Sequence, residues 1–499
     1  MWELTAGQLG MWYHERLHAE SAICNVGEYL EIRGRLDVEL FEAALRRVIG
    51  RADAFHIRIH DEDERAWQEI DSSGDWSLRV IDVSPEADPR AAAQEWMRTD
   101  MLRPFDLREG PVFAQALLKI SSDLFFWYQS AHQAALDGTS FHIVASQVAR
   151  TYTALLPGGG PSAGDSPRPV SALLESYRSY RRSAEFDRDR EFWRDVLAGF
   201  PGRRGQAAAQ PPRRYTEPVS SDDVVAMKKA AWRLGTNFGG LLVAAAAIYL
   251  HRVTGAEDVV VGFQVDWRAG KRERDTPGMA VTVLPIRLAV RGTATVASLT
   301  RDVTAAIVGA LPHQRYLNDA FRGMVVNVMP FDCELSFGDC AAYVHNLANG
   351  PVDDLTISAY DRPTAHGTEI SYDLNPDLYG PVSGKDVARR FGRILGWLTT
   401  ASTSDLVGLI DGEMASCHSH LADYDYQGPA GLAREAGRRG STDPAGTRRV
   451  AARAVRRPPR RRRPAHPGTE QHASLGHQPR VLHPDGRVAA GDSARDDLR

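Results

Sequence analysis

Residues 125–138 read FFWYQSAHQAALDG, an aromatic run that leads into a polar turn. The aromatic residues predict a buried strand that ends near His132. A helical pattern follows Gly138, and Asp137 just before it suits a helix N-terminus, where a carboxylate is favoured. His132 and Gln133 therefore fall in the turn between a strand and a helix. Side chains in such a turn are well placed for chemistry on a substrate bound in a cleft.

The segments on both sides of this turn mix helices and strands. Thr5 and Asp37 have the spacing of helix caps. Apolar periodicity predicts helices at about 89–102, 138–155, 172–197, 238–254 and 385–399. It predicts strands at about 26–32, 112–120, 124–128, 259–262, 281–288, 324–329, 355–360 and 369–373. Two α/β units of similar size follow, with a cleft between them as the default location of a binding site.

A Gly- and Pro-rich stretch, PGGGPSAGDSPRP at 157–169, separates the two units. We expect an N-terminal lobe at 1–160, a linker at 161–171 and a C-terminal lobe at 172–425. Residues 426–499 form an Arg-, Pro- and Gly-rich tail that has too little apolar surface to order itself. The tail is interpreted as a disordered, solvated segment or an out-of-frame read-through, with polyanion binding as the alternative.

Composition excludes several classes of function. Hydrophobic residues make up 43% and charged residues 25%, and no apolar run approaches the 18 residues of a membrane span. No secretion signal begins the chain, and the four cysteines form neither a disulfide framework nor a zinc pattern, so a cytoplasmic location is expected. The sequence contains no phosphate loop, nucleotide-binding Gly motif or metal cluster. A specific nucleic-acid function would rest on the Arg-rich tail alone, and none is expected.

The segment SAHQAALDG at 130–138 resembles the HHxxxDG motif of nonribosomal peptide synthetase condensation domains. Other stretches resemble further motifs of this family: 4–8 with Trp12, 51–58, 104–111, 177–193, 251–262, 277–287, 313–316 and 373–379. The resemblance covers roughly residues 2–425. It implies two chloramphenicol acetyltransferase-like lobes, arranged as a V-shaped pseudo-dimer with a tunnel between them.

The resemblance also implies a reaction. A carrier-bound acyl or peptidyl thioester is joined to the amine of a carrier-bound aminoacyl thioester. The partners are upstream and downstream peptidyl carrier proteins, which carry the substrates on phosphopantetheine, and the domain itself is expected to bind no cofactor and no metal. We expect a monomer or a part of a larger synthetase, because the sequence contains neither a carrier-domain Ser motif nor an adenylation core.

Position 133 is where the sequence departs from the family. Gln133 matches the second His of the motif, which the family uses catalytically. His132 matches the first His, whose role in the family is architectural, with base catalysis as the alternative. Gln cannot take a proton, but it can donate and accept hydrogen bonds. Amide formation can therefore survive through positioning, since an α-amine with a pKa of about 7.7–8.0 is partly neutral at pH 7.

The remaining candidates support or surround this position. Asp137 matches the motif Asp, which pairs with an Arg in the family, and Arg287 is the expected partner. Gly138 allows close backbone packing. Asn327 and Trp267 are candidate tunnel-lining residues, with an ordinary strand residue and a packing residue as the respective alternatives.

Two other functions are compatible with the sequence. The first is a catalytically inactive domain that recruits carrier proteins or tailoring enzymes. The second is a related acyltransferase outside peptide synthesis, such as an ester-forming one. Gln133 argues against ester formation, because a hydroxyl nucleophile needs a base more than an amine does.

Overall fold

The structure is a computed structural model that describes residues 1–18, 21–62, 65–74, 76–158, 168–200, 209–268, 270–316, 321–329, 335–360, 368–380 and 382–410. The predicted tail at 426–499 and most of the predicted linker at 161–171 lie outside these residues. The lobe boundaries therefore stay predictions.

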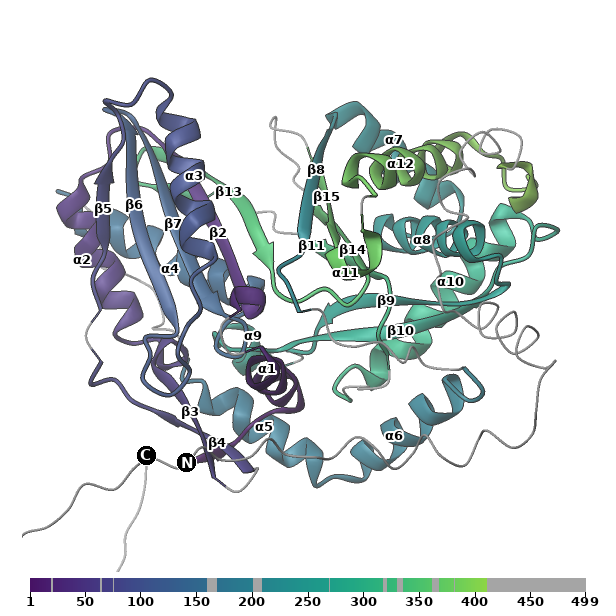
Figure 1. Cartoon of the computed structure of the whole chain (residues 1–499), viewed down its shortest axis with the longest axis horizontal. Coiled ribbons are helices and arrows are strands. Elements are labelled where there is room, and N and C mark those ends of the chain that lie inside the picture. The colour runs from purple at the N-terminus through teal and green to yellow at the C-terminus, as the bar shows by residue number, and fades with distance from the viewer. Residues whose placement is uncertain are drawn as a thin grey trace, which may run out of the picture. The chain divides into compact units, whose positions relative to one another are not determined.

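The first sheet holds the motif turn and has strand order β12-β13-β2-β7-β6-β5 among the described residues (Figure 1). Its strands are β12 (Leu335–Phe337), β13 (Cys340–Asn349), β2 (Asn25–Arg33), β7 (Leu124–His132), β6 (Phe113–Ser121) and β5 (Arg79–Asp82). Helices α2 (Val38–Ile49) and α4 (Gly138–Leu155) cover one face, where Phe41 packs edge-on against Trp127. Helix α3 (Pro89–Met101) covers the other face through Met97, which joins Phe126 in a second apolar cluster.

The second sheet has strand order β10-β9-β11-β14-β15-β8 within the same described ranges. Its strands are β10 (Val281–Ala289), β9 (Asp258–Asp266), β11 (Val325–Met329), β14 (Leu355–Tyr360), β15 (Thr368–Leu374) and β8 (Arg213–Val219). Helices α8 (Phe238–Thr254), α10 (Val296–Ala310) and α12 (Gly384–Thr400) pack on one face, and α7 (Ser221–Arg233) packs against α8 and α12. This confirms the predicted mixed α/β class.

Smaller elements complete the described chain. Helix α1 (Ala6–Leu17) begins at Thr5, and a small sheet is formed by β1 (Trp2–Glu3), β4 (Arg65–Ile70) and β3 (Ile57–Glu62). Two short helices, α9 (Lys271–Arg274) and α11 (Pro376–Tyr379), and the 3₁₀ turns η1 (Ala22–Cys24), η2 (Asp53–His56), η3 (Leu311–His313) and η4 (Val407–Ile410) lie between the longer elements.

Two expectations about local structure need correction. The helix predicted at 172–197 is two helices, α5 (Ser171–Arg181) and α6 (Ala184–Val196), because Ser183 takes an extended conformation between them. The strand β13 was not predicted, and it pairs with β2 although it lies in the segment assigned to the C-terminal lobe. Apolar periodicity predicts neither the interruption between α5 and α6 nor the pairing of β13 with a strand of the first sheet.

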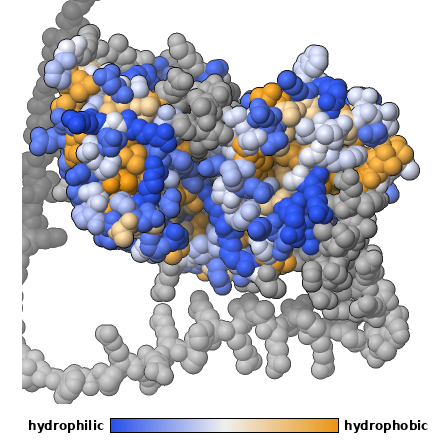
Figure 2. Space-filling model, turned by 90° about the horizontal axis from the view of Figure 1, so that it is seen from above, coloured by the Kyte–Doolittle hydropathy of each residue, from blue (hydrophilic) through white to orange (hydrophobic). Residues whose placement is uncertain are grey.

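The described surface mixes polarities. Seen from above, hydrophilic and hydrophobic residues are interspersed, with no single polarity covering the face (Figure 2). Within the residues searched, no single helix has the length and apolar character of a membrane span; α7 and α8 pass that test only as a pair bent by 87°.

Candidate active site

The motif turn is held between β7 and α4. His132 ends β7 and pairs with Asn25 of β2, and α4 begins at Gly138. Asp137 is the N-cap of α4: its carboxylate accepts a hydrogen bond from the Ser140 backbone N–H at 2.9 Å. The predicted placement of the motif between a strand and a helix is therefore confirmed.

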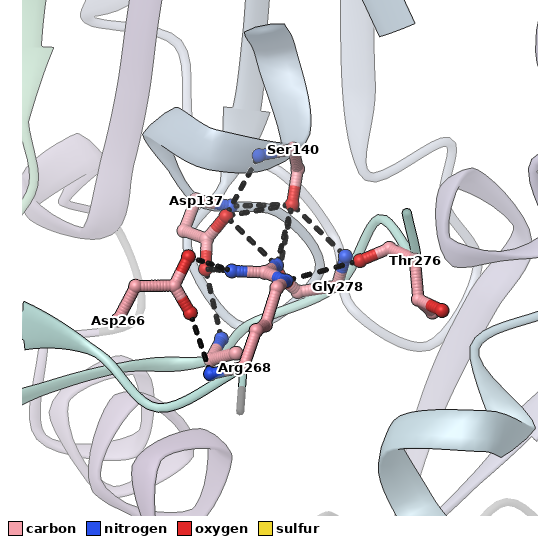
Figure 3. Close-up of polar contacts among 7 residues, drawn as sticks. Asp137, Ser140, Asp266, Arg268, Thr276 and Gly278 are labelled. Carbon is pink, nitrogen blue, oxygen red and sulfur yellow. Dashed lines mark hydrogen bonds and ion pairs between the residues drawn. The ribbon is translucent and has the colours of Figure 1, made fainter. Parts of the chain in front are cut away.

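Arg268 fixes this turn to the second sheet. Its guanidinium is surrounded by oxygen acceptors, which are Asp137 Oδ2 (3.0 Å) and Oδ1 (3.1 Å), Asp266 Oδ2 (2.8 Å), Ser140 Oγ (3.2 Å), Gly278 O (2.6 Å) and Thr276 O (3.1 Å) (Figure 3). The Arg268 and Asp137 side chains are each 1% exposed. Burial by itself lowers the pKa of Arg268, but the two carboxylates outweigh burial and raise it.

Asp137 is satisfied on all sides by this arrangement. Besides Arg268 and Ser140, it accepts a hydrogen bond from the Ala280 N–H at 2.8 Å. A buried carboxylate needs hydrogen-bond partners of this kind, and removing any one of them leaves an acceptor without water to replace it. Asp137 thus joins the turn of the first sheet to the loop that precedes β10.

The predicted partner of Asp137, Arg287, is wrong. Arg287 pairs instead with Asp258 at 2.7 Å, with side chains 27% and 51% exposed. The reason is its distance along β10: Asp137 meets the residue just before this strand, whereas Arg287 lies six residues beyond Val281, about 20 Å away at the rise of a strand. Arg268 lies just after the end of β9. Because Asp266 at that end pairs with Val281 at the start of β10, the register of this hairpin places Arg268 beside Asp137.

Among the described residues, His132 makes a hydrogen bond through one ring nitrogen, Nδ1. Its side chain is 1% exposed, Nδ1 accepts a hydrogen bond from the Ala134 N–H at 3.1 Å, and Nε2 lies 3.5 Å from Glu15 Oε2. An acceptor role for Nδ1 places the proton of the neutral ring on Nε2, facing the Glu15 carboxylate. The lone pair of Nδ1 therefore accepts the Ala134 N–H and is not free to take a proton. This geometry favours the architectural role over base catalysis.

Glu15, Cys24 and His132 also form a cluster of metal-ligand types. Their ligand atoms lie within 4.8 Å of one another. A metal on Nε2 would require the His132 proton on Nδ1, where it would face the Ala134 N–H. Burial, and then the charge of Glu15, raise the pKa of the Cys24 thiol far above its usual range, which opposes a thiolate ligand. We assign no metal to this cluster, whose Glu15 and Cys24 carried no recognisable signal in the sequence.

Gln133 presents an unused acceptor. Its backbone N–H donates to the Cys24 carbonyl at 2.9 Å, and the residue is 9% exposed. In the part of the chain that the structure describes, the side-chain Oε1 is buried without a hydrogen-bond partner. An unmade buried hydrogen bond costs about 1–3 kcal/mol, so an N–H donor that reached this oxygen would remove that cost.

The two predicted tunnel-lining residues have different surroundings. Asn327 is 4% exposed on β11, paired with Ser358 of β14. Trp267 is 7% exposed and clusters with Leu173 and Tyr177 of α5. Trp267 therefore packs against α5, and its role in lining the tunnel stays a prediction.

Comparison with known proteins identifies what the chain resembles. A family model described as the condensation domain matches residues 1–319. The chain is 36% identical over 430 residues to the dimodular nonribosomal peptide synthase of Bacillus subtilis (strain 168), covering 82% of this chain and 18% of that protein. It is 35% identical over 396 residues to the isonitrile lipopeptide synthase of Streptomyces coeruleorubidus, covering 75% of this chain and 27% of that protein.

Solved structures agree with these relatives. The starter condensation domain of rhizomide synthetase, as a mutant in complex with C8-CoA, matches with a TM-score of 0.75 and 35% identity, covering 82% of this chain and 96% of that one. The first condensation domain of the CDA synthetase matches with a TM-score of 0.73 and 28% identity, covering 82% of this chain and 98% of that one. These matches confirm the chloramphenicol acetyltransferase-like fold.

Proposed function

Because the chain belongs to the condensation-domain family of nonribosomal peptide synthetases, we propose that it forms an amide bond between two carrier-bound thioesters. The partners are an upstream and a downstream peptidyl carrier protein, each presenting its substrate on phosphopantetheine. The chain spans between 5% and 30% of the length of the curated relatives it matches, so the carriers are expected on other segments or proteins. The site of action is the cytoplasm.

The acyl donor is proposed to be a starter acyl group rather than a growing peptide. The support is the likeness to a starter condensation domain bound to C8-CoA and to an isonitrile lipopeptide synthase. The lobes are proposed to be residues 1–160 and 172–425.

In the proposed step, the neutral α-amine of the acceptor attacks the thioester carbonyl of the donor. The C–N bond forms, the C–S bond breaks, the donor carrier leaves as its thiol, and the amine proton passes to the departing sulfur or to water. The observation that carries the proposal is the buried Oε1 of Gln133, which has no partner among the described residues and can accept an N–H of the amine. Gln133 orients the nucleophile and moves no proton.

Positioning can supply most of the rate. Holding two reactants in attack geometry gives effective molarities of about 10⁵ M or more, whereas a general base adds about 10²–10⁴-fold. About a tenth of an α-amine with a pKa of 7.7–8.0 is already neutral at pH 7. The missing base at position 133 therefore slows the reaction without removing its main source of acceleration.

The second candidate is a recruitment domain that binds carriers without condensing their substrates. It is favoured by one observation: Gln133 cannot ionise, and the neighbouring His132 has its Nδ1 lone pair bound to the Ala134 N–H. In this function the fold would supply carrier docking alone.

One experiment separates the two candidates. Both carriers are loaded, incubated with wild type or with Gln133→His, and the carrier-bound products are measured by intact-protein mass spectrometry. Amide product with wild type, increased by Gln133→His, supports condensation. Carrier binding by both proteins with product from neither supports recruitment and rejects the proposed step.

A further inference from the structure

The end of β13 runs past the candidate active site. This strand follows β11 and precedes β14 of the second sheet, yet it pairs with β2 of the first. Its register shifts between Asn346 and Ala348, after which Asn349 pairs with Val26, next to the residue that pairs with His132. We call residues 346–350 the strap, since they pass from one sheet to the other beside the motif turn.

The first tie of the strap comes from Arg214 on β8. Arg214 Nε and Nη2 donate to both carboxylate oxygens of Asp373 at 2.6 Å, and Nη1 donates to Asn346 Oδ1 at 2.6 Å and to its carbonyl at 3.2 Å. The Asp373 side chain is 1% exposed. A planar guanidinium can hold a carboxylate on one edge and an amide on another, which an ammonium group cannot do.

The second tie comes from Asn349. Its Nδ2 donates to Ser358 Oγ at 3.1 Å and to Tyr360 Oη at 3.3 Å, both on β14. The strap is therefore fixed to the second sheet at two residues and paired to the first sheet through β2. Its last residue has little freedom to move relative to either sheet.

That last residue, Gly350, lies directly against Gln133. A Cβ at position 350 would lie 2.1 Å from Gln133 Oε1 and 2.9 Å from its Cδ, far inside van der Waals contact. Gly350 has φ of +86°, a conformation in which glycine is favoured. The side-chain amide of Gln133 thus packs against the backbone of Gly350, and the position of that backbone determines where Oε1 lies.

We propose that the strap is the positioning element for Gln133: Arg214 and Asn349 hold Gly350 in place, and Gly350 fixes the acceptor oxygen that orients the nucleophilic amine. This inference rests on the proposed function. It assigns a rate effect to contacts outside the motif, because a misplacement of about 1 Å in a reacting geometry can cost about 10²-fold. Arg214, Asn349 and Gly350 are positioning residues, and none is required to touch substrate.

The first test is Gly350→Ala in the wild type and in the Gln133→Ala background. Gly255→Ala is the matched control: Gly255 also has a positive φ, +69°, but nothing lies within 4 Å of its missing Cβ. In single-turnover assays, Gly350→Ala should lower the maximal rate about tenfold or more in wild type and less than about threefold in Gln133→Ala. Gly255→Ala should change the rate less than about threefold in both.

The second test loosens the ties without touching the turn. Asn349→Ala, and Arg214→Lys, should lower the maximal rate about tenfold while leaving the half-saturating concentration of the acceptor carrier within about twofold. Arg389→Lys applies the same exchange to the exposed pair with Asp386 and should change neither quantity. A folded Asn349→Ala protein keeps the test decisive even where Gly350→Ala fails to fold.

The outcomes separate the inference from the proposed function. Equal losses from Gly350→Ala in both backgrounds, or full activity of Asn349→Ala and Arg214→Lys, would overturn the strap as a positioning element while leaving condensation intact. Absence of product from wild type alongside product from Gln133→His would reject the proposed function of the wild type. In that case, urea unfolding of wild type, Gly350→Ala, Gln133→Ala and the double variant measures the coupling in stability between positions 350 and 133. Coupling in stability without any product reduces the strap to a structural role and also overturns the inference.

Discussion

The Arg268–Asp137 pair gives a prediction whose size follows from burial. Arg268→Gln removes the guanidinium that contacts five residues and leaves the Asp137 carboxylate, 1% exposed, with the Ser140 N–H and hydroxyl and the Ala280 N–H but no cation. Breaking a buried pair by removing one partner costs about 3–5 kcal/mol. At about 1.4 kcal/mol per factor of ten, even the lower figure corresponds to more than 100-fold in the unfolding equilibrium.

The control is Arg389→Gln, which removes an Arg from an exposed pair with Asp386, with side chains 52% and 40% exposed. Exposed pairs contribute about 0–1 kcal/mol, so this variant should unfold close to the wild-type urea midpoint. Urea titrations followed by tryptophan fluorescence provide the comparison, provided that the slope of each transition is unchanged. Equal losses from the two variants, or a loss below about 1 kcal/mol for Arg268→Gln, would refute the role given to the buried pair.

Three further predictions concern single groups. Because burial raises the pKa of the Cys24 thiol, Cys24 should react with iodoacetamide at pH 8 on the order of 100-fold more slowly in the folded protein than in urea, by peptide mass spectrometry; equal rates would contradict its burial. Burial lowers the pKa of His14, so the unfolded chain binds a proton at this residue at a higher pH than the folded chain does. The free energy of unfolding should therefore fall as the pH drops below about 6.5. His14→Phe should remove about 1.4 kcal/mol of this fall per unit of pKa difference, measured by urea unfolding at pH 5 and 7. The neutral His132 ring should be the Nε2–H tautomer in ¹⁵N spectra of histidine-labelled protein, and a neutral Nδ1–H tautomer would contradict its hydrogen bond from Ala134.

Local features of the fold were predictable because short-range chemistry determines them. Thr5 and Gln8 form the capping box of α1, and Asp37 caps α2, as their spacing indicates. The buried helix α8 keeps the predicted bounds, 238–254, since Asn237 caps its start and Gly255 ends it in a left-handed conformation. Position 133 was likewise identified without tertiary contacts, because residues 132–138 resemble the HHxxxDG motif of the family.

Long-range partners were not predictable in the same way. The sequence contains several arginines that could reach Asp137, and only the register of β9 against β10 decides for Arg268. The exchange of β13 into the first sheet depends on its pairing with β2, about 300 residues earlier in the chain, which apolar periodicity does not encode. The contact between Gly350 and Gln133 follows from that exchange, so it could be found only in the folded chain.

The most direct test of amide formation without a base at position 133 is the pH dependence of the wild-type single-turnover rate, measured with both carriers loaded between pH 6 and 9. If Gln133 only orients the amine, the rate should rise about tenfold per pH unit and level off near the amine pKa of about 7.7–8.0. Gln133→His should raise the rate most at pH 7, by about 10²-fold or more. No wild-type product at any pH, or a rate that levels off near pH 6.5 as for a histidine base, would contradict the account.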